Sequence, residues 1–261
     1  MKSSVELLTA IAPQFKITLA LQDGNSSIFV VPVAEPSGRT HVFRIRVIND
    51  KNPSATEVSG VLPSFCPQRH INSDGSFCLG WGKDAPAEVT GTNSAEAWWG
   101  GVLEFLRLQL RAARARKWTG PEWAHGDAAK HQMVAENAAK QLGNDVFADL
   151  QQYRLKVEWS SRTAPNGGRI LKVRRRDKEW FAVLERERRV INKQQPCVCA
   201  IGSVKHHRRL RNCCDHSQQA YQLAISLMEW RREEERFWML CSGVQCCKTI
   251  DDCPLGKSSE K

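Results

Sequence analysis

The sequence predicts an α+β protein in which an antiparallel strand meander is packed by helices and is followed by a basic, cysteine-rich unit. Three observations lead to this fold class. Segments 16–22, 27–33 and 40–47 are rich in β-branched residues and are separated by turn residues. Segment 94–117 carries apolar residues at helical spacing. All of the formal charge of +10 falls in residues 151–261.

Charge and cysteine content change at the same place in the chain, near residue 150. Only Cys66 and Cys78 precede it, and the other eight cysteines lie between residues 197 and 253. A chain of 261 residues also exceeds the commonest size of a single domain. The sequence therefore predicts two domains, residues 1–150 and residues 151–261.

The first part is predicted to begin with a short helix over 3–13, followed by the three strands. In "VFRIRV", residues 42–47, apolar residues alternate with arginines, which is typical of a strand with one buried face. Ser94 is placed to cap the long helix. Its predicted buried stripe consists of Trp98, Val102, Leu103, Leu106 and Leu110, opposite Arg107, Arg111 and Arg114.

A further helix is predicted over 127–153, with an interruption at Gly143. The second part then opens with "RLKVEW", "ILKVRRR" and "WFAVLER", which together predict a small unit of hairpins with basic faces. Its last element is predicted as one helix from about Asp215 to Leu240.

The early apolar run is interrupted by Glu6, and no apolar segment of 18 residues follows. We therefore expect a cytoplasmic protein that does not insert into membranes. Cysteines in such a protein are expected to be thiols, metal ligands or catalytic groups instead of a disulfide framework.

Cys78 is the first candidate for chemistry, in the segment "CPQRHINSDGSFCLGW". A thiolate is the nucleophile that thioester exchange requires, and nearby Arg69 and His70 are expected to lower a thiol pKa from about 8.5. The alternative is that Cys78 is a small buried apolar residue, which is the interpretation we give to Cys66.

The segment "HINSDGSFCL", residues 70–79, resembles the active-site segment of ubiquitin-conjugating enzymes. In that family an asparagine, a short turn with glycine, an apolar residue, the catalytic cysteine and a leucine follow in the same order. The order of first helix, strand meander, cysteine loop and long helix is also similar over about residues 1–120. The resemblance implies a ubiquitin-conjugating-enzyme-like fold for the first domain, with Cys78 as a catalytic, thioester-forming cysteine.

One position departs from the family pattern. An asparagine eight residues before the family's cysteine stabilises the oxyanion formed during amine attack, and His70 occupies that position here, after Gln68 and Arg69. An imidazole can donate a hydrogen bond to an oxyanion or accept a proton, so His70 is the second predicted catalytic residue. The alternative is a loop histidine that fixes the turn.

Three acids lie near Cys78 in the sequence. Asp74 is expected to stabilise the Asp-Gly turn, because its side chain suits that backbone geometry. Asp84 and Glu88 are interpreted as solvated loop acids, with orientation of an incoming lysine as the alternative.

The sequence is similar in organisation to bacterial stand-alone relatives of these enzymes that carry a cysteine-rich extension and occur in CBASS antiphage operons. The resemblance implies that the acyl donor is the C-terminus of a cGAS-like nucleotidyltransferase and that the acceptors are amines of target proteins. The chain has neither a phosphate loop nor a G-x-G-x-x-G fingerprint. We therefore expect the acyl group to be activated elsewhere.

Eight cysteines surround the last predicted helix, four on each side, and suit tetrahedral Zn²⁺, with one or two ions. Disulfides, a redox role, an iron–sulfur cluster and unliganded thiols stay open as alternatives. The predicted ligands are Cys197, Cys199, Cys213, Cys214, Cys241, Cys246, Cys247 and Cys253, with His206, His207 and His216 as substitutes.

The basic stretches "KVRRR", "RERR" and "KHHRRLR" could form a solvated face, bind an acidic protein surface or hold phosphates. Glu179, Glu185 and Glu187 interrupt the arginines, so nucleic acid is not the expected partner. A non-catalytic, zinc-containing module that binds protein or nucleic acid is the alternative function.

Overall fold

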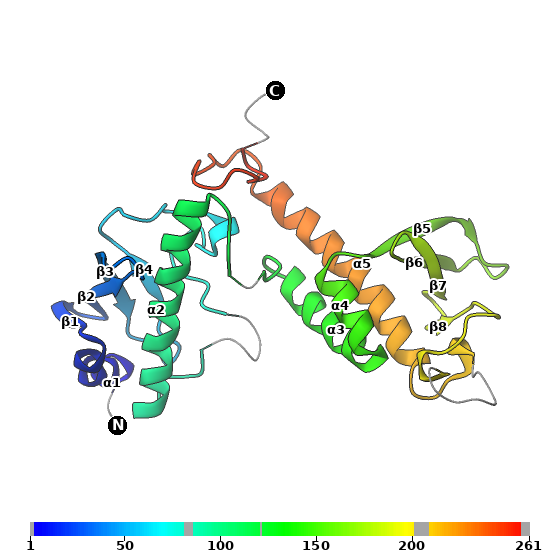
Figure 1. The fold of residues 1–261 in the computed structure, drawn as a ribbon, viewed down its shortest axis with the longest axis horizontal. Helices are drawn as coiled ribbons and strands as arrows, with labels where there is room; N and C mark the ends of the chain where they lie inside the picture. Colours follow the sequence, from blue (N-terminus) through cyan, green and yellow to red (C-terminus); the bar gives the residue numbers. More distant parts are fainter. Residues whose placement is uncertain (1–2, 81–85, 121, 201–208, 257–261) are drawn as a thin grey trace. The chain divides into compact units, whose positions relative to one another are not determined.

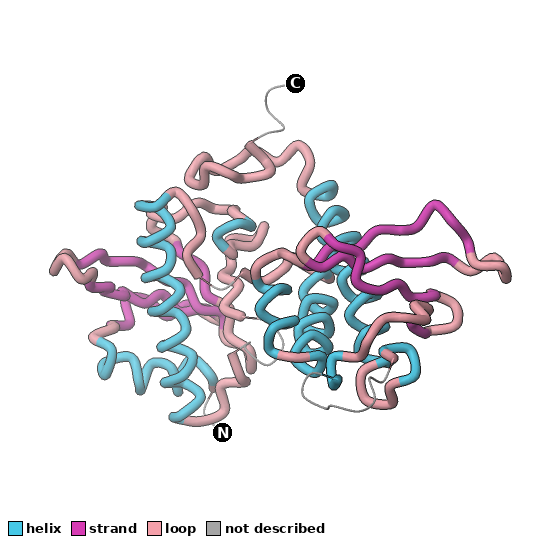
Figure 2. The backbone as a smooth tube through the Cα atoms, turned by 45° about the vertical axis from the view of Figure 1, so that its right-hand side comes forward, coloured by secondary structure: helices cyan, strands magenta, loops and turns pink. Residues whose placement is uncertain are grey.

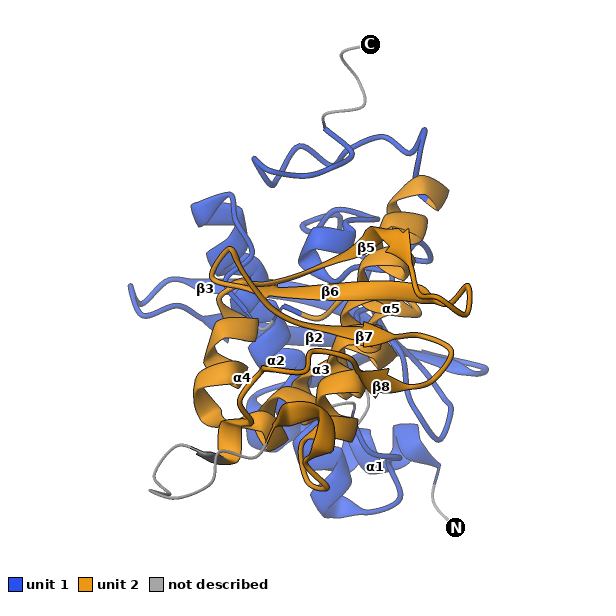
Figure 3. Ribbon diagram, turned by 90° about the vertical axis from the view of Figure 1, so that its right-hand side faces the viewer, with its two compact units in different colours: residues 1–122, 241–261 blue, residues 123–240 orange. Residues whose placement is uncertain are grey.

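The computed structural model describes residues 3–80, 86–120, 122–200 and 209–256 (Figure 1). They form a mixed structure of helices and antiparallel sheets, divided into two compact units (Figure 3). The first unit combines residues 1–122 with residues 241–261, and the second is residues 123–240. The division therefore differs from the boundary predicted at residue 150.

The first unit contains, in chain order, α1 (Ser4–Ile11), η1 (Ala12–Phe15), β1 (Thr18–Asp23), β2 (Ser26–Ala34), β3 (Thr40–Ile48), β4 (Ala55–Glu57), η2 (Pro67–Arg69) and α2 (Thr92–Ala115). Ser3 and Glu6 form a capping box that begins α1. The strands pair in chain order as an antiparallel four-stranded sheet (Figure 2).

Helix α2 packs against the buried face of this sheet. Alternate residues of β2 and β3 are buried, as the apolar and arginine alternation predicts. Trp99 of α2 meets Phe29 of β2 edge to face, with ring centroids 5.1 Å apart. The helix begins at Thr92, two residues before the predicted cap, and the Ser94 hydroxyl accepts the Gly91 amide at 3.1 Å.

The second unit contains α3 (Ala128–Leu142), α4 (Asn144–Gln151), β5 (Leu155–Thr163), β6 (Arg169–Arg175), β7 (Lys178–Leu184), β8 (Arg189–Val190), η4 (Val198–Ala200), η5 (Leu210–Asn212) and α5 (Ser217–Leu240). The single helix predicted over 127–153 is two helices, divided at Gly143. Strands β5 to β8 form a second antiparallel sheet in chain order.

The core of the second unit explains why its boundary lies near residue 122. Ala135 and Ala139 of α3 are buried in one cluster with Leu223 of α5 and Phe181 of β7. These small alanines let α3 lie closely beside α5 (Figure 1). Helices α3 and α4 therefore share a core with the sheet that follows them in the chain.

None of the helices in the described ranges is long and apolar enough to cross a bilayer.

Candidate active site and metal centre

Short backbone bridges position the segment that carries Cys78. Cys66 pairs with Ile71, and Ile71 pairs in turn with Phe77, so three short stretches of chain lie side by side. The Cys78 amide donates to the His70 carbonyl at 2.9 Å. The Phe77 ring stacks on Phe105 of α2 with centroids 4.5 Å apart, which anchors the residue preceding the thiol. The backbone of Cys78 is therefore fixed by its own amide bond and by the packing of the preceding residue.

The turn between His70 and Cys78 is closed by its own polar side chains. Asn72 Nδ2 donates to the Ser76 hydroxyl at 3.0 Å, and Asp74 Oδ1 accepts from the Ser76 amide at 2.9 Å. The Ser76 hydroxyl also donates to Asp74 Oδ1, at 2.6 Å, and this bond, followed by the bond from the Ser76 amide, holds the pKa of Asp74 below its usual range. Gly75 supplies the positive φ of 80° that the turn requires. Asp74 thus has the turn-stabilising position that the sequence predicts.

Cys78 is half-buried, and the structure corrects the expected direction of its pKa shift. Burial raises the pKa of the thiol, and a backbone hydrogen bond at Gly80 only partly opposes this. The predicted lowering by Arg69 does not occur, because the Arg69 guanidinium is turned into the core of the unit. Asp84, predicted near this thiol, lies outside the described residues, and Glu88 is exposed.

His70 is half-buried and adopts a left-handed backbone conformation, with φ of 56°, directly after η2. Its ring packs on Trp118, with centroids 4.9 Å apart and planes inclined by 55°. His70 therefore fixes the loop through its carbonyl and rests its ring on an aromatic neighbour. The bond from the Cys78 amide to the His70 carbonyl agrees with the turn-fixing interpretation of His70. The catalytic interpretation stays a prediction.

Arg69 is a structural residue that sequence reasoning missed. It is 2% exposed, and its Nε donates to Gln109 Oε1 of α2 at 2.8 Å. Gln109 Nε2 returns a bond to the Arg69 carbonyl at 2.6 Å, and Arg69 Nη1 donates to Thr249 Oγ1 at 3.0 Å. These bonds join the cysteine loop to α2 and to the C-terminal segment.

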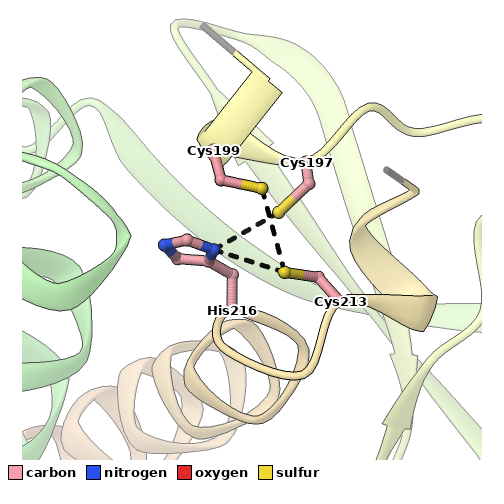
Figure 4. A group of neighbouring side chains, drawn as sticks. All are labelled: Cys197, Cys199, Cys213 and His216. Carbon is pink, nitrogen blue, oxygen red and sulfur yellow. Dashed lines mark hydrogen bonds between the residues drawn. The ribbon is translucent and has the colours of Figure 1, made fainter. Parts of the chain in front are cut away.

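A second group of chemically active side chains lies at the beginning of α5 (Figure 4). Cys197 is the residue before η4, and Cys199 lies within η4. Cys213 directly follows η5, and His216 directly precedes α5. The Pro196 to Arg209 bridge and the Leu210 amide bond to the Gln195 carbonyl at 2.9 Å hold the two segments together.

The geometry of this group fits a tetrahedral metal ion. The His216 Nδ1 lies 3.4 Å from the sulfurs of both Cys197 and Cys213, and the sulfurs of Cys199 and Cys213 are 3.9 Å apart. Zinc bonds of about 2.3 Å to sulfur and about 2.0–2.1 Å to nitrogen give tetrahedral edges of roughly 3.5–3.8 Å. The four ligand atoms all lie within 4.8 Å of one another.

The thiols of this group also differ in acidity. Although burial opposes ionisation, hydrogen bonds from His216 and neighbouring groups lower the pKa of Cys213 to about 6. Burial raises the pKa of Cys197 to about 12, and its interaction with Cys213 acts in the same direction. Because the pKa of Cys213 lies below neutral pH, its thiolate is available to bind a cation. The charge of a bound cation would then stabilise the thiolate form of the other cysteines in the group.

The structure brings together three of the eight predicted cysteine ligands, with His216 as the fourth member. Cys214 is exposed, and its thiol contacts Asp215 at 3.4 Å. Cys214 is not a member of the group that contains Cys213. His206 and His207 lie outside the described residues.

The remaining predicted ligands belong to the first unit. Cys241 is buried, and its burial raises the pKa of its thiol. Burial also raises the pKa of Cys253 to about 11, and a hydrogen bond with Cys246 acts in the same direction. Cys247 instead contacts Cys66. Within the described ranges, these cysteines do not form a group of three or more possible ligands.

Acidic side chains compensate many of the basic residues of the second unit. Arg175 binds both Asp145 and Asp149, and Lys172 binds Glu179 at 2.9 Å. At these positions the strands therefore present paired charges instead of a continuous basic track.

The chain thus combines a helix-covered antiparallel sheet, which carries a cysteine on a loop, with a second unit that carries a Cys₃His group. Residues 15–120 match the family described as prokaryotic E2 domain. Residues 124–255 match the family described as cysteine-rich domain, C-terminal to E2 domain. The chain belongs to this family of prokaryotic E2-like proteins with a cysteine-rich C-terminal domain. No curated protein and no solved structure matches it.

Proposed function

We propose that this protein is a ubiquitin-conjugating-like acyltransferase in which Cys78 carries the C-terminus of a partner protein as a thioester. The observation that carries the proposal is the placement of Cys78. Its backbone is fixed by the His70 carbonyl, while its side chain remains half-accessible at the end of a closed turn. The family, an E2 domain followed by a cysteine-rich domain, supports conjugation as the class of reaction.

The proposed cycle has two steps. The Cys78 thiolate attacks the activated carbonyl of the donor, and the tetrahedral oxyanion collapses as the donor's previous leaving group departs. A target amine then attacks the thioester, loses a proton, and expels Cys78 as a thiolate, leaving an amide. His70 is the proposed oxyanion donor for the second step, and thiolate departure makes the transfer favourable.

The proposed donor is a cGAS-like nucleotidyltransferase of an antiphage system, and the proposed acceptors are amines of target proteins. This part rests on the resemblance of the Cys78 segment to that type of bacterial enzyme. The proposed role of the Cys₃His group is to hold Zn²⁺, which would cross-link η4, η5 and the start of α5 when bound.

The test supplies the nucleotidyltransferase with its C-terminal carboxyl already converted to a thioester, so that no activating enzyme is needed. The expected product on a non-reducing gel is a conjugate with this protein that dithiothreitol cleaves. Cys78→Ala abolishes it, whereas Cys78→Ser gives a conjugate that resists the thiol. Cys214→Ser is the matched control, because Cys214 is an exposed thiol of the other unit.

Two results would overturn the enzyme proposal. A conjugate that persists in Cys78→Ala would assign the chemistry to another thiol. Absence of any conjugate, together with salt-dependent binding to DNA or to an acidic protein that Cys78→Ala leaves unchanged, would favour the non-catalytic interaction module.

A further inference from the structure

Two cysteines from opposite ends of the sequence meet inside the first unit. The sulfurs of Cys66 and Cys247 lie 3.1 Å apart, although 181 positions separate the residues. Both are thiols in the structure. Cys66 is 1% exposed, whereas Cys247 is half-buried, so only one sulfur of the pair is open to a reagent in solution.

The surroundings of this pair fit thiol chemistry better than metal binding. A tetrahedral metal site needs three or four protein ligands. Within the described ranges, Cys66 and Cys247 belong to no group of three histidine, cysteine or acidic ligands. The sulfur of Cys247 also lies 3.1 Å from the Thr249 hydroxyl oxygen, which is a hydrogen-bonding group.

We propose that Cys66 and Cys247 form a reversible disulfide that fastens the C-terminal segment 241–256 to the base of the Cys78 loop. Cys66 bridges to Ile71, and Ile71 bridges to Phe77, the residue before Cys78. The bond would therefore join the last described segment of the chain to the strand-like base that carries this loop. This site is independent of acyl transfer.

The oxidant in the proposed step is a low-molecular-weight disulfide such as oxidised glutathione. The Cys247 thiolate attacks one glutathione sulfur and displaces the other as a thiolate, which takes up a proton. Cys66 then loses its proton and attacks the Cys247 sulfur of the mixed disulfide, displacing the second glutathione. Two protein thiols are oxidised, and one disulfide is reduced to two thiols.

The electrostatics of the pair support this order of events. A hydrogen bond from Cys66, with further contributions from Thr249 and Arg69, lowers the pKa of Cys247 to about 5 despite its partial burial. The same contact raises the pKa of Cys66. Once Cys247 is in a mixed disulfide, its negative charge is gone while the Arg69 guanidinium remains. The second thiol is then easier to ionise.

The test uses the full-length reduced protein, incubated with oxidised glutathione, alkylated and digested with trypsin without reduction. Cleavage at basic residues places Cys66 in residues 52–69 and Cys247 in residues 237–248, together with Cys241 and Cys246. The expected product is a dithiothreitol-sensitive cross-link between these two peptides.

Matched variants identify the sulfur involved. The cross-link should persist in Cys246→Ser, whose change lies on the same peptide, and should be lost in Cys247→Ser and Cys66→Ala. Oxidation should raise the melting temperature of the wild type and of Cys246→Ser by roughly 5–10 °C, because the bond closes a long loop. Cys247→Ser should show no rise.

Three outcomes would overturn the proposal. They are a cross-link that survives in Cys247→Ser, a stable glutathione adduct on Cys247 without a cross-link, and a cross-link that leaves the melting temperature unchanged. None of these measurements needs an acyl donor, so they are decided separately from the proposed transferase activity.

Discussion

The half-buried thiol of Cys78 has a raised pKa, so only a small fraction of it is thiolate at neutral pH. We expect its rate of reaction with iodoacetamide to rise about tenfold per pH unit and to continue rising above pH 8.5, the ordinary range for cysteine. Mass spectrometry of the tryptic peptide 70–83 measures this directly, since Cys78 is its only cysteine. The same peptide in urea is the control. A plateau below pH 8 would contradict the raised pKa.

Asp149 provides a second prediction about a single residue. Its side chain is 1% exposed and accepts from Arg175 Nε at 2.6 Å and Arg176 Nε at 3.0 Å. Burial opposes ionisation, but these arginines outweigh it and hold the carboxyl pKa below its usual value. We expect Asp149→Asn to lower the free energy of unfolding by about 2–3 kcal/mol at pH 7, measured with urea.

The sign of the pH dependence follows from the lowered pKa. The carboxylate stabilises the folded state above the unfolded pKa of about 3.9, and this contribution is lost as the pH falls through the folded pKa. The difference between wild type and Asp149→Asn should therefore shrink in acid. Asp177→Asn, which removes an exposed partner of Lys156, is the control and should be neutral. An equal effect of both variants would contradict the argument.

The break between α3 and α4 makes a prediction about an element. Gly143 has φ of 141° and ψ of 153°, a region that residues with side chains rarely adopt, and an added Cβ would lie 2.8 Å from Asp145 Oδ1. We expect Gly143→Ala to destabilise the protein by about 1–3 kcal/mol in urea unfolding.

A glycine inside a regular helix serves as the control for this substitution. Gly100 lies within α2, and a Cβ added there meets nothing within 4 Å. Gly100→Ala should stabilise the protein by about 1 kcal/mol, because alanine is the better helix former. If both variants shifted stability in the same direction, the backbone argument would be wrong.

Regular elements were the most predictable part of this molecule. Alternation in 42–47 and helical spacing in 94–117 are local signals, and the structure has β3 and α2 there. The bonds of Arg69 were not predictable, since Gln109 and Thr249 are 40 and 180 positions away. The predicted direction of the Cys78 pKa shift was wrong for the same reason. An arginine nearby in sequence is turned away in space.

The Cys₃His group shows the same limit at the level of the site. Sequence spacing identified the ligand types, but the choice among cysteines depends on how η4 and η5 are brought together by a backbone bridge. The resemblance of residues 70–79 to an active-site segment indicated the family, because this signal is contained in one short stretch of sequence. Only the structure grouped His216 with three of the cysteines.

For the whole molecule, we predict that the second unit depends on one bound zinc ion. Elemental analysis should give one ion per chain in the wild type and in Cys214→Ser, and none in Cys213→Ser. Removal by a chelator should lower the melting temperature, and acidification should release the ion, because protons compete for the thiolates and the imidazole. A metal-free wild type with unchanged stability would contradict this prediction.

The chain leaves the first unit at residue 122 and returns to it at residue 241. A ribosome therefore releases the partners of Arg69 and Arg116, Thr249 and Asp251, only after the whole second unit has been made. The first unit cannot finish its own packing during synthesis until residues 241–256 emerge. Removal of residues 241–256 would consequently disturb the packing of residues 3–120, where the change in sequence does not lie.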